Sequence, residues 1–134
     1  MTVEVLYLDS SAIVKLVARE PETDALVERL RPGPDLVTSA LARTEVARAT
    51  RRAGVAGVDP ARADAVLERI ALLRVDEAVL DLAGALDPPR LRTLDAIHLA
   101  SALTVGEALT ALVTYDDQLA SAARGEGLQV LAPS

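Results

Sequence analysis

The sequence predicts an α/β fold in which helices cover both faces of a central parallel sheet of four to five short strands. Short apolar stretches rich in β-formers alternate with longer stretches of helical periodicity along the 134 residues, which is typical of such three-layer folds. Proline- and glycine-containing breakers separate these stretches. Phe and Trp are absent although apolar residues make up 51% of the chain, so the core must consist of Leu, Val, Ile and Ala. We expect a single domain over residues 1–134.

The first predicted element is the apolar stretch 3–8, which leads directly into Asp9. It has the composition of a buried strand, and open α/β sheets bind their ligands at the carboxyl ends of the strands. Ser10 and Ser11 follow, and we expect their hydroxyls to cap a helix over 10–18. Asp9 is therefore predicted to lie at the ligand-binding edge of the sheet.

The remaining elements follow from helical periodicity, capping residues and breakers. Further strands are expected at 35–38, 74–75, 111–114 and 128–131. Further helices are expected at 20–30, 40–53, 61–73, 78–86, 94–104 and 116–124, with Asp59 and Thr93 as caps of two of them. The strands are thus separated by helices throughout the chain, as a parallel sheet requires.

The net charge is −6 and the chain has no cysteine. The negative charge by itself argues against a nucleic-acid partner, because phosphate binding favours a basic surface. That argument loses its force if clustered acids hold divalent cations. The lack of cysteine excludes disulfides and thiolate chemistry and fits a reducing cytosol. Acids interrupt every long apolar stretch, so we expect a cytoplasmic protein without a signal peptide or membrane span.

Glu45 is the second acid of interest, after Asp9. It shares a stripe with Leu41, Ala42 and Ala49 on its predicted helix. A carboxylate on a buried stripe needs a partner. The structural alternative is a helix rotated so that Glu45 faces solvent and pairs with Arg48 at i+3.

Asp95 is the third acid, in the first turn of the helix predicted at 94–104. Leu99 and Ala102 lie on its side of that helix. An acid in a first turn is also favoured simply by the helix dipole. His98 follows at i+3, and as the single histidine it is predicted to be packed or hydrogen-bonded rather than a metal ligand.

Asp116 repeats the arrangement of Asp9, because it follows a predicted buried strand and precedes a helix. Either Asp116 or the adjacent Asp117 could serve only as a helix cap. The four acids taken together favour another explanation, since strand ends and the helices that follow them meet at one edge of a parallel sheet. Clustered carboxylates repel one another and attract hard cations such as Mg²⁺ or Mn²⁺. Such a centre activates water for attack on a phosphodiester.

These residues resemble the PIN domains, and within them the toxins of VapBC toxin–antitoxin pairs. The resemblance covers essentially the whole chain. It rests on LDSSA at 8–12, on Glu45, on LDAIHLA at 94–100 and on VTYD at 113–116. Each motif is short, but their order and spacing together are specific.

The resemblance implies that Asp9, Glu45, Asp95 and Asp116 bind Mg²⁺ or Mn²⁺ and cut RNA as the catalytic acids of an endoribonuclease. It implies that Thr114 supports the site, and we expect the same of Ser10. A PIN-like sandwich, a homodimer and a cognate antitoxin protein that blocks the acidic pocket are also implied. The antitoxins of this family frequently place an arginine among the carboxylates.

Four basic residues are candidates for binding the RNA: Lys15, Arg48, Arg51 and Arg52. The alternative for the arginines is a solvated helix face. A non-catalytic binding module with the same fold is a second possible function, and absence of metal binding would favour it. A phosphohydrolase with a nucleophilic aspartate is a third, but such enzymes typically need an acid where Ser11 stands. A glycine-rich dinucleotide loop is missing after the first strand.

Overall fold

The sheet has five parallel strands, which confirms the predicted α/β class. The computed structural model describes residues 3–31, 33–52 and 59–134. The strand order is β3-β2-β1-β4-β5, with the central β1 pairing Tyr7 with Val37 of β2 and Leu112 of β4. The strands are β1 (Val5–Leu8), β2 (Asp35–Ser39), β3 (Ala71–Leu73), β4 (Ala111–Val113) and β5 (Val130–Leu131).

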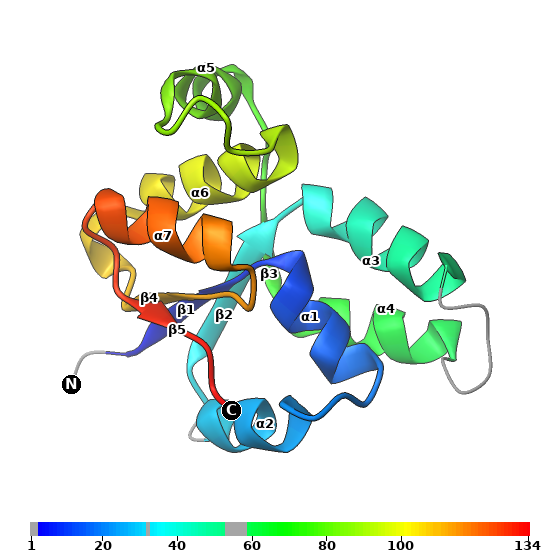
Figure 1. Ribbon diagram of the computed structural model, residues 1–134. Coiled ribbons are helices and arrows are strands. Elements are labelled where there is room, and N and C mark those ends of the chain that lie inside the picture. Colours follow the sequence, from blue (N-terminus) through cyan, green and yellow to red (C-terminus); the bar gives the residue numbers. More distant parts are fainter. Residues whose placement is uncertain (1–2, 32, 53–58) are drawn as a thin grey trace.

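Helices pack on both faces of the sheet and complete the three layers (Figure 1). One face carries α1 (Ser10–Val17), α2 (Thr23–Leu30), α3 (Leu41–Arg52) and α4 (Pro60–Glu68). The other carries α6 (Thr93–Val105), the short 3₁₀ turn η1 (Gly106–Ala108) and α7 (Asp117–Gly125), with α5 (Glu77–Ala85) packed against α6. The beginnings of α1, α3 and α7 therefore come together near the carboxyl ends of the central strands (Figure 1).

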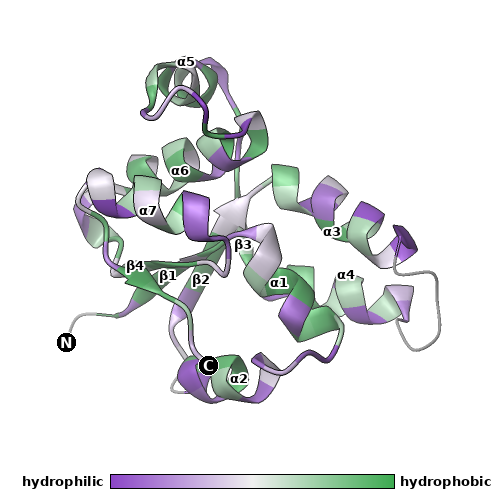
Figure 2. Cartoon of the chain, in the orientation of Figure 1, coloured by the Kyte–Doolittle hydropathy of each residue, from purple (hydrophilic) through white to green (hydrophobic). Residues whose placement is uncertain are grey.

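A hydrophobic core lies on each face of the sheet, and β1 contributes side chains to both. This is possible because successive side chains of a strand point to opposite faces of the sheet. Leu6 and Leu8 pack with α1 to α4, whereas Tyr7 packs with α6 and α7, and all three are fully buried. The central strands are accordingly mostly hydrophobic in Figure 2, and the hydrophilic residues lie mainly on the helices. This burial on both faces is what a continuous apolar run in a parallel strand predicts.

The third strand lies earlier than predicted. The helix expected at 61–73 ends at Glu68, and the strand is formed by Ala71–Leu73 rather than by residues 74–75. Ala71 and Leu72 continue the apolar pattern of the helix, so periodicity alone does not mark the boundary. The boundary is set by pairing with β2, in which Leu72 lies opposite Thr38.

Several helix starts also differ from prediction, most of them by one residue. α2 begins at Thr23 instead of residue 20, because the Thr23 hydroxyl donates to the backbone oxygen of Lys15 and accepts from the Glu20 N–H, which holds 20–22 in a turn. Thr93 is the first residue of α6 and not its cap. The end predicted for the helix 40–53 falls partly on residues outside the described ones. Among the described residues, no helix combines the length and apolar character needed to cross a bilayer.

Candidate active site

The four predicted acids line one cleft of about 660 Å³ at the carboxyl ends of β1 and β4. They come from four different elements. Asp9 ends β1, Glu45 lies on α3, Asp95 lies in the first turn of α6, and Asp116 immediately precedes α7. Asp117 is exposed and does not line the cleft. The convergence expected from the topology is therefore present in the structure.

Asp9 is the cap of α1, a role that had been predicted for the two serines. Its Oδ1 accepts from the backbone N–H of Ala12 at 3.0 Å and from the Ser11 hydroxyl at 2.7 Å. Its Oδ2 accepts from the Thr114 hydroxyl at 2.5 Å. The extended backbone of Asp9 places this side chain over the first turn, which leaves the serine hydroxyls available for other bonds.

Burial dominates the electrostatics of Asp9, whose residue is 2% exposed. Burial raises the pKa of this carboxyl, and the hydrogen bonds from Thr114, Ser11 and Ala12 oppose that rise. A negative charge at this position is therefore unfavourable without further compensation. A bound cation would supply it.

Thr114 and Ser11 join the ends of β1 and β4. The Thr114 hydroxyl that donates to Asp9 also accepts from the Asp116 N–H at 3.1 Å. The Ser11 hydroxyl accepts from the Tyr115 N–H at 3.0 Å. Thr114 thus contacts both strand-end acids. Ser10, the serine predicted to support the site, lines the cleft. Ser11 was predicted to cap the helix and to argue against a nucleophilic aspartate, but its bonds to Asp9 and Tyr115 were not predicted.

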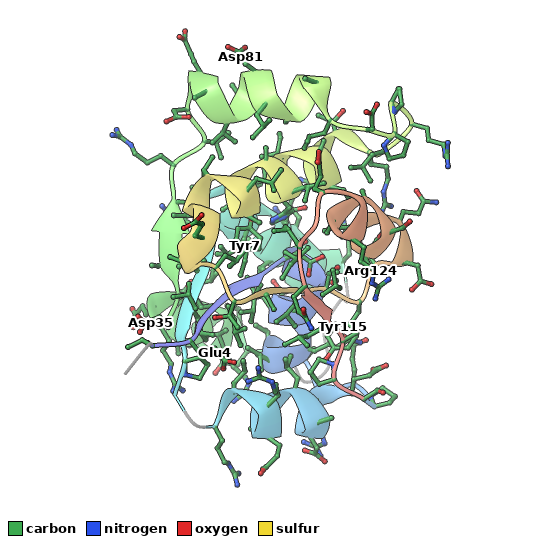
Figure 3. The ribbon with its side chains drawn as sticks, turned by 90° about the vertical axis from the view of Figure 1, so that its left-hand side faces the viewer. Glu4, Tyr7, Asp35, Asp81, Tyr115 and Arg124 are labelled. Carbon is green, nitrogen blue, oxygen red and sulfur yellow. The ribbon has the colours of Figure 1, made fainter. Side chains whose placement is uncertain are left out.

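Glu45 is held by a buried chain of hydrogen bonds that begins on β1. The Tyr7 hydroxyl lies 2.7 Å from Nδ1 of His98, and Nε2 of His98 lies 2.5 Å from Oε1 of Glu45. Figure 3 shows Tyr7 inside the molecule, beside the sheet. His98 is 1% exposed, so its predicted role as a hydrogen-bonded residue is confirmed. The expected alternative for Glu45, a surface pair with Arg48, is not formed among the described residues.

Arg92 contacts the other two acids and was not singled out from the sequence. Its Nε donates to Oδ2 of Asp95 at 3.0 Å, and its Nη2 donates to Oδ2 of Asp116. Burial of the Asp95 carboxyl raises its pKa, and the negative charge of Asp116 raises it further, while Arg92 lowers it. The spacing of Arg92 and Asp95, at i and i+3, was a signal available in the sequence.

The predicted RNA-binding residues lie at or near the cleft. Arg48, Arg52 and Lys15 line it, and Arg51 joins the two arginines around an adjoining recess. Lys15 differs from the arginines because it is buried. Its Nζ pairs with Glu22 at 3.0 Å and with Glu20 at 3.4 Å, and it lies over the ring of Tyr115.

The donor set of the cleft fits a hard divalent cation, since all four acids present carboxylate oxygens. Within residues 3–31, 33–52 and 59–134, no three His, Cys, Asp or Glu side chains are already grouped as a ligand set. Hydroxyls hold Asp9, an imidazole holds Glu45, and a guanidinium holds Asp95 and Asp116. Rearrangement of these side chains would accompany metal binding.

Comparison with known proteins places the chain in a family. Residues 6–125 match the family model described as "PIN domain". Ribonuclease VapC46 of Mycobacterium tuberculosis is 54% identical over 96% of this chain and 98% of its own length. The chain belongs to the PIN-domain VapC ribonuclease family. Its members are toxins of VapBC toxin–antitoxin systems.

Further relatives of this VapC protein extend the comparison. Ribonuclease VapC35 of Mycobacterium tuberculosis is 45% identical over 96% of each chain. Among solved structures, a chain of the VapBC2 complex of Rickettsia felis, bound to a promoter DNA fragment, superposes with a TM-score of 0.72 at 15% identity. The superposition covers 97% of this chain and 99% of the Rickettsia felis chain. VapC20 of Mycobacterium tuberculosis, a Sarcin-Ricin loop cleaving toxin, gives a TM-score of 0.64 at 18% identity, covering 87% and 94%.

Proposed function

We propose that this VapC protein is a Mg²⁺- or Mn²⁺-dependent endoribonuclease and that Asp9, Glu45, Asp95 and Asp116 are its catalytic acids. The observation that carries the proposal is their convergence from four elements on one cleft. The chemistry expected of an ion held by these residues is activation of water and stabilisation of charge on the phosphodiester.

Each residue has a defined part in this proposal. Asp9, Asp95 and Asp116 hold the metal, and Glu45 holds a second ion or orients the attacking water. His98 fixes the Glu45 carboxylate through the bond between Nε2 and Oε1. Thr114 holds Asp9 and Asp116 in fixed positions relative to each other, because its hydroxyl bonds to both residues. Ser10 and Ser11 support the Asp9 end of the cleft.

The basic side chains beside the cleft support RNA as the substrate. Arg48 and Arg52 are exposed on α3, with Arg51 next to them. They form a local positive surface despite the net charge of −6. Lys15 contributes less in this arrangement, because its charge is compensated by Glu20 and Glu22.

We infer further that a cognate antitoxin protein covers the acidic cleft and that the chain forms a homodimer in the cytoplasm. The VapBC2 structure supports the first inference, since its fold matches this chain. If a small open reading frame lies just upstream of the gene, coexpression with its product should abolish cleavage and yield a complex larger than the free toxin on size exclusion. Cleavage that is unaffected by that protein would contradict this partner.

Expression in a bacterium, followed by sequencing of the RNA ends that appear, tests the proposed activity. Growth arrest with discrete new ends is expected for the wild type and not for Asp95→Asn. Asp81→Asn is the matched control, because Asp81 lies on the outer side of α5 (Figure 3). Full cleavage by the Asp95→Asn protein would contradict the catalytic assignment. Absence of Mg²⁺ and Mn²⁺ binding would favour the non-catalytic module.

A further inference from the structure

Arg92 reaches from the surface into the acidic cleft. Its side chain is 67% exposed, whereas those of Asp95 and Asp116 are 14% and 23% exposed. The guanidinium donates through two different nitrogens, one to each acid. Arginine suits this arrangement, because its planar group presents several donors in fixed directions. The single, largely exposed side chain of Arg92 therefore compensates the negative charge of two acids of the proposed metal site.

Helix capping does not explain this position. Arg92 is the N-cap residue of α6, and its side chain makes no capping hydrogen bond. Arginine is a poor residue there, since a cap needs an acceptor and the helix dipole disfavours a positive charge at the amino-terminal end. The contacts with Asp95 and Asp116 are thus the interactions that hold its guanidinium at this end of the helix.

The other two acids have uncharged or weakly basic partners. Asp9 accepts from hydroxyls and a backbone amide, and Glu45 bonds to the imidazole of His98. Among the ion pairs of the described residues, Arg92 is the one lysine or arginine that contacts any of the four acids, and it contacts two of them. A permanent positive charge is therefore placed on one side of the cleft.

We propose that Arg92 is a built-in counter-ion of the acidic cleft, which a divalent cation must displace from Asp95 and Asp116. This inference rests on the proposed metal site, for which the Arg92 guanidinium would compete with the metal. The guanidinium binds the carboxylates of Asp95 and Asp116, which would also hold the metal, so the two cations would compete for them. Because the arginine is largely exposed, its release into solvent costs little. Arg92 consequently raises the metal concentration at which the site fills, while it limits repulsion between the two acids when metal is absent.

The test is a titration of the metal-depleted protein with Mn²⁺ in the absence of RNA. Binding is monitored by calorimetry or by the electron paramagnetic resonance signal of free Mn²⁺. Arg92→Gln should bind Mn²⁺ about three- to tenfold more tightly than wild type, because a competing ion pair and a like charge are removed. Arg90→Gln is the matched control. It removes the same charge from an exposed residue nearby that does not line the cleft, and its affinity should stay close to wild type.

Thermal unfolding provides a second readout that does not depend on activity. In EDTA the Arg92→Gln protein should melt below wild type, and saturating Mn²⁺ should raise its Tm by more than it raises that of wild type. If Arg92→Gln does not fold, Arg92→Lys keeps the charge without the two-nitrogen contact, and it should bind Mn²⁺ more tightly than wild type.

Two results would overturn the inference in distinguishable ways. Unchanged or weaker Mn²⁺ binding by Arg92→Gln, with normal binding by wild type, would overturn the competition alone and leave the proposed metal site intact. No Mn²⁺ binding by any of the proteins would overturn the metal site and the competition together.

Discussion

Nε2 of His98 lies 2.5 Å from Oε1 of Glu45, and this bond joins α6 to α3 beside the acidic cleft. On the other side of the ring, Nδ1 bonds to the buried hydroxyl of Tyr7. With the ring hydrogen on Nε2, the imidazole donates to the carboxylate and accepts from Tyr7. A core residue of β1 is therefore linked to a candidate catalytic acid through the His98 ring.

Exchange of Glu45 for Gln separates the charge of this residue from its hydrogen bond. The amide oxygen still accepts from His98, so the free energy of unfolding should stay within about 1 kcal/mol of wild type. RNA cleavage should fall by at least about 100-fold, because a neutral amide is a weaker ligand for a cation and a weaker acceptor for the attacking water than a carboxylate. Urea unfolding and a gel-based cleavage assay measure the two effects.

Tyr7→Phe tests the opposite case, in which a buried hydrogen bond is removed and the charge of Glu45 is kept. It should lower the free energy of unfolding by about 1–2 kcal/mol, because a buried hydrogen bond is lost, and it should retain most of the cleavage. If Glu45→Gln kept full activity, Glu45 would be a structural residue only.

Thr114 offers a second matched pair of variants. Thr114→Val removes the donor to Asp9 and the acceptor for the Asp116 N–H. We expect a loss of about 1–3 kcal/mol in the free energy of unfolding, since buried polar groups lose their partner, together with reduced cleavage. Thr114→Ser keeps the hydroxyl and should remain close to wild type in cleavage. Equal activity of the Val and Ser proteins would argue against the supporting role.

The raised pKa of Asp9 predicts a distinctive pH dependence for the metal-free protein. Because burial raises the pKa in the folded state, the folded state binds more protons than the unfolded state between the ordinary value of 3.8 and the raised one. Stability contributed by this group therefore falls as the pH rises through that window. Asp9→Asn lacks the titration, so its stability relative to wild type should increase with pH.

Unfolding in EDTA at a series of pH values from about 4 upward, for both proteins, measures this difference. Saturating Mg²⁺ should reduce it, because the metal compensates the buried charge of the wild type. A difference that is independent of pH would contradict the assignment of burial as the dominant influence on Asp9.

The arginines of α3 should contribute to RNA affinity mainly through phosphate contacts. Arg48→Gln and Arg52→Gln are each expected to weaken binding and to lower the slope of log affinity against log salt concentration by about 1. Arg43→Gln is the control, since Arg43 is exposed on the same helix but does not line the cleft. Fluorescence anisotropy with labelled RNA over a range of salt concentrations measures the slopes. An equal effect of Arg43→Gln would indicate non-specific attraction instead.

Local rules were sufficient to predict much of the fold and the four acids. Asp9 and Asp116 follow buried apolar strands, and such positions are recognisable because parallel strands deliver their carboxyl ends to one edge. The short edge strand β3 was misplaced because Ala71–Leu73 continues a helical pattern and becomes a strand only by pairing with β2.

The partners of the acids were less predictable, since they depend on how distant elements pack. The contact between His98 and Glu45 joins residues 53 positions apart, and nothing local specifies it. Arg92 reaches Asp116 only because α6 and α7 begin side by side at the cleft. The role of Ser11 required the backbone conformation that makes Asp9 the helix cap.

Cleavage of RNA by the purified toxin and by its Asp9→Asn variant, in Mg²⁺ and in EDTA, tests the central claim most directly. The asparagine Oδ1 still accepts from the Ala12 N–H, so α1 keeps its cap and the variant should fold. We predict discrete cleavage by wild type in Mg²⁺, none in EDTA, and none by Asp9→Asn under either condition. Wild-type cleavage rates from a folded Asp9→Asn protein would contradict the assignment of Asp9 to a metal-dependent catalytic site.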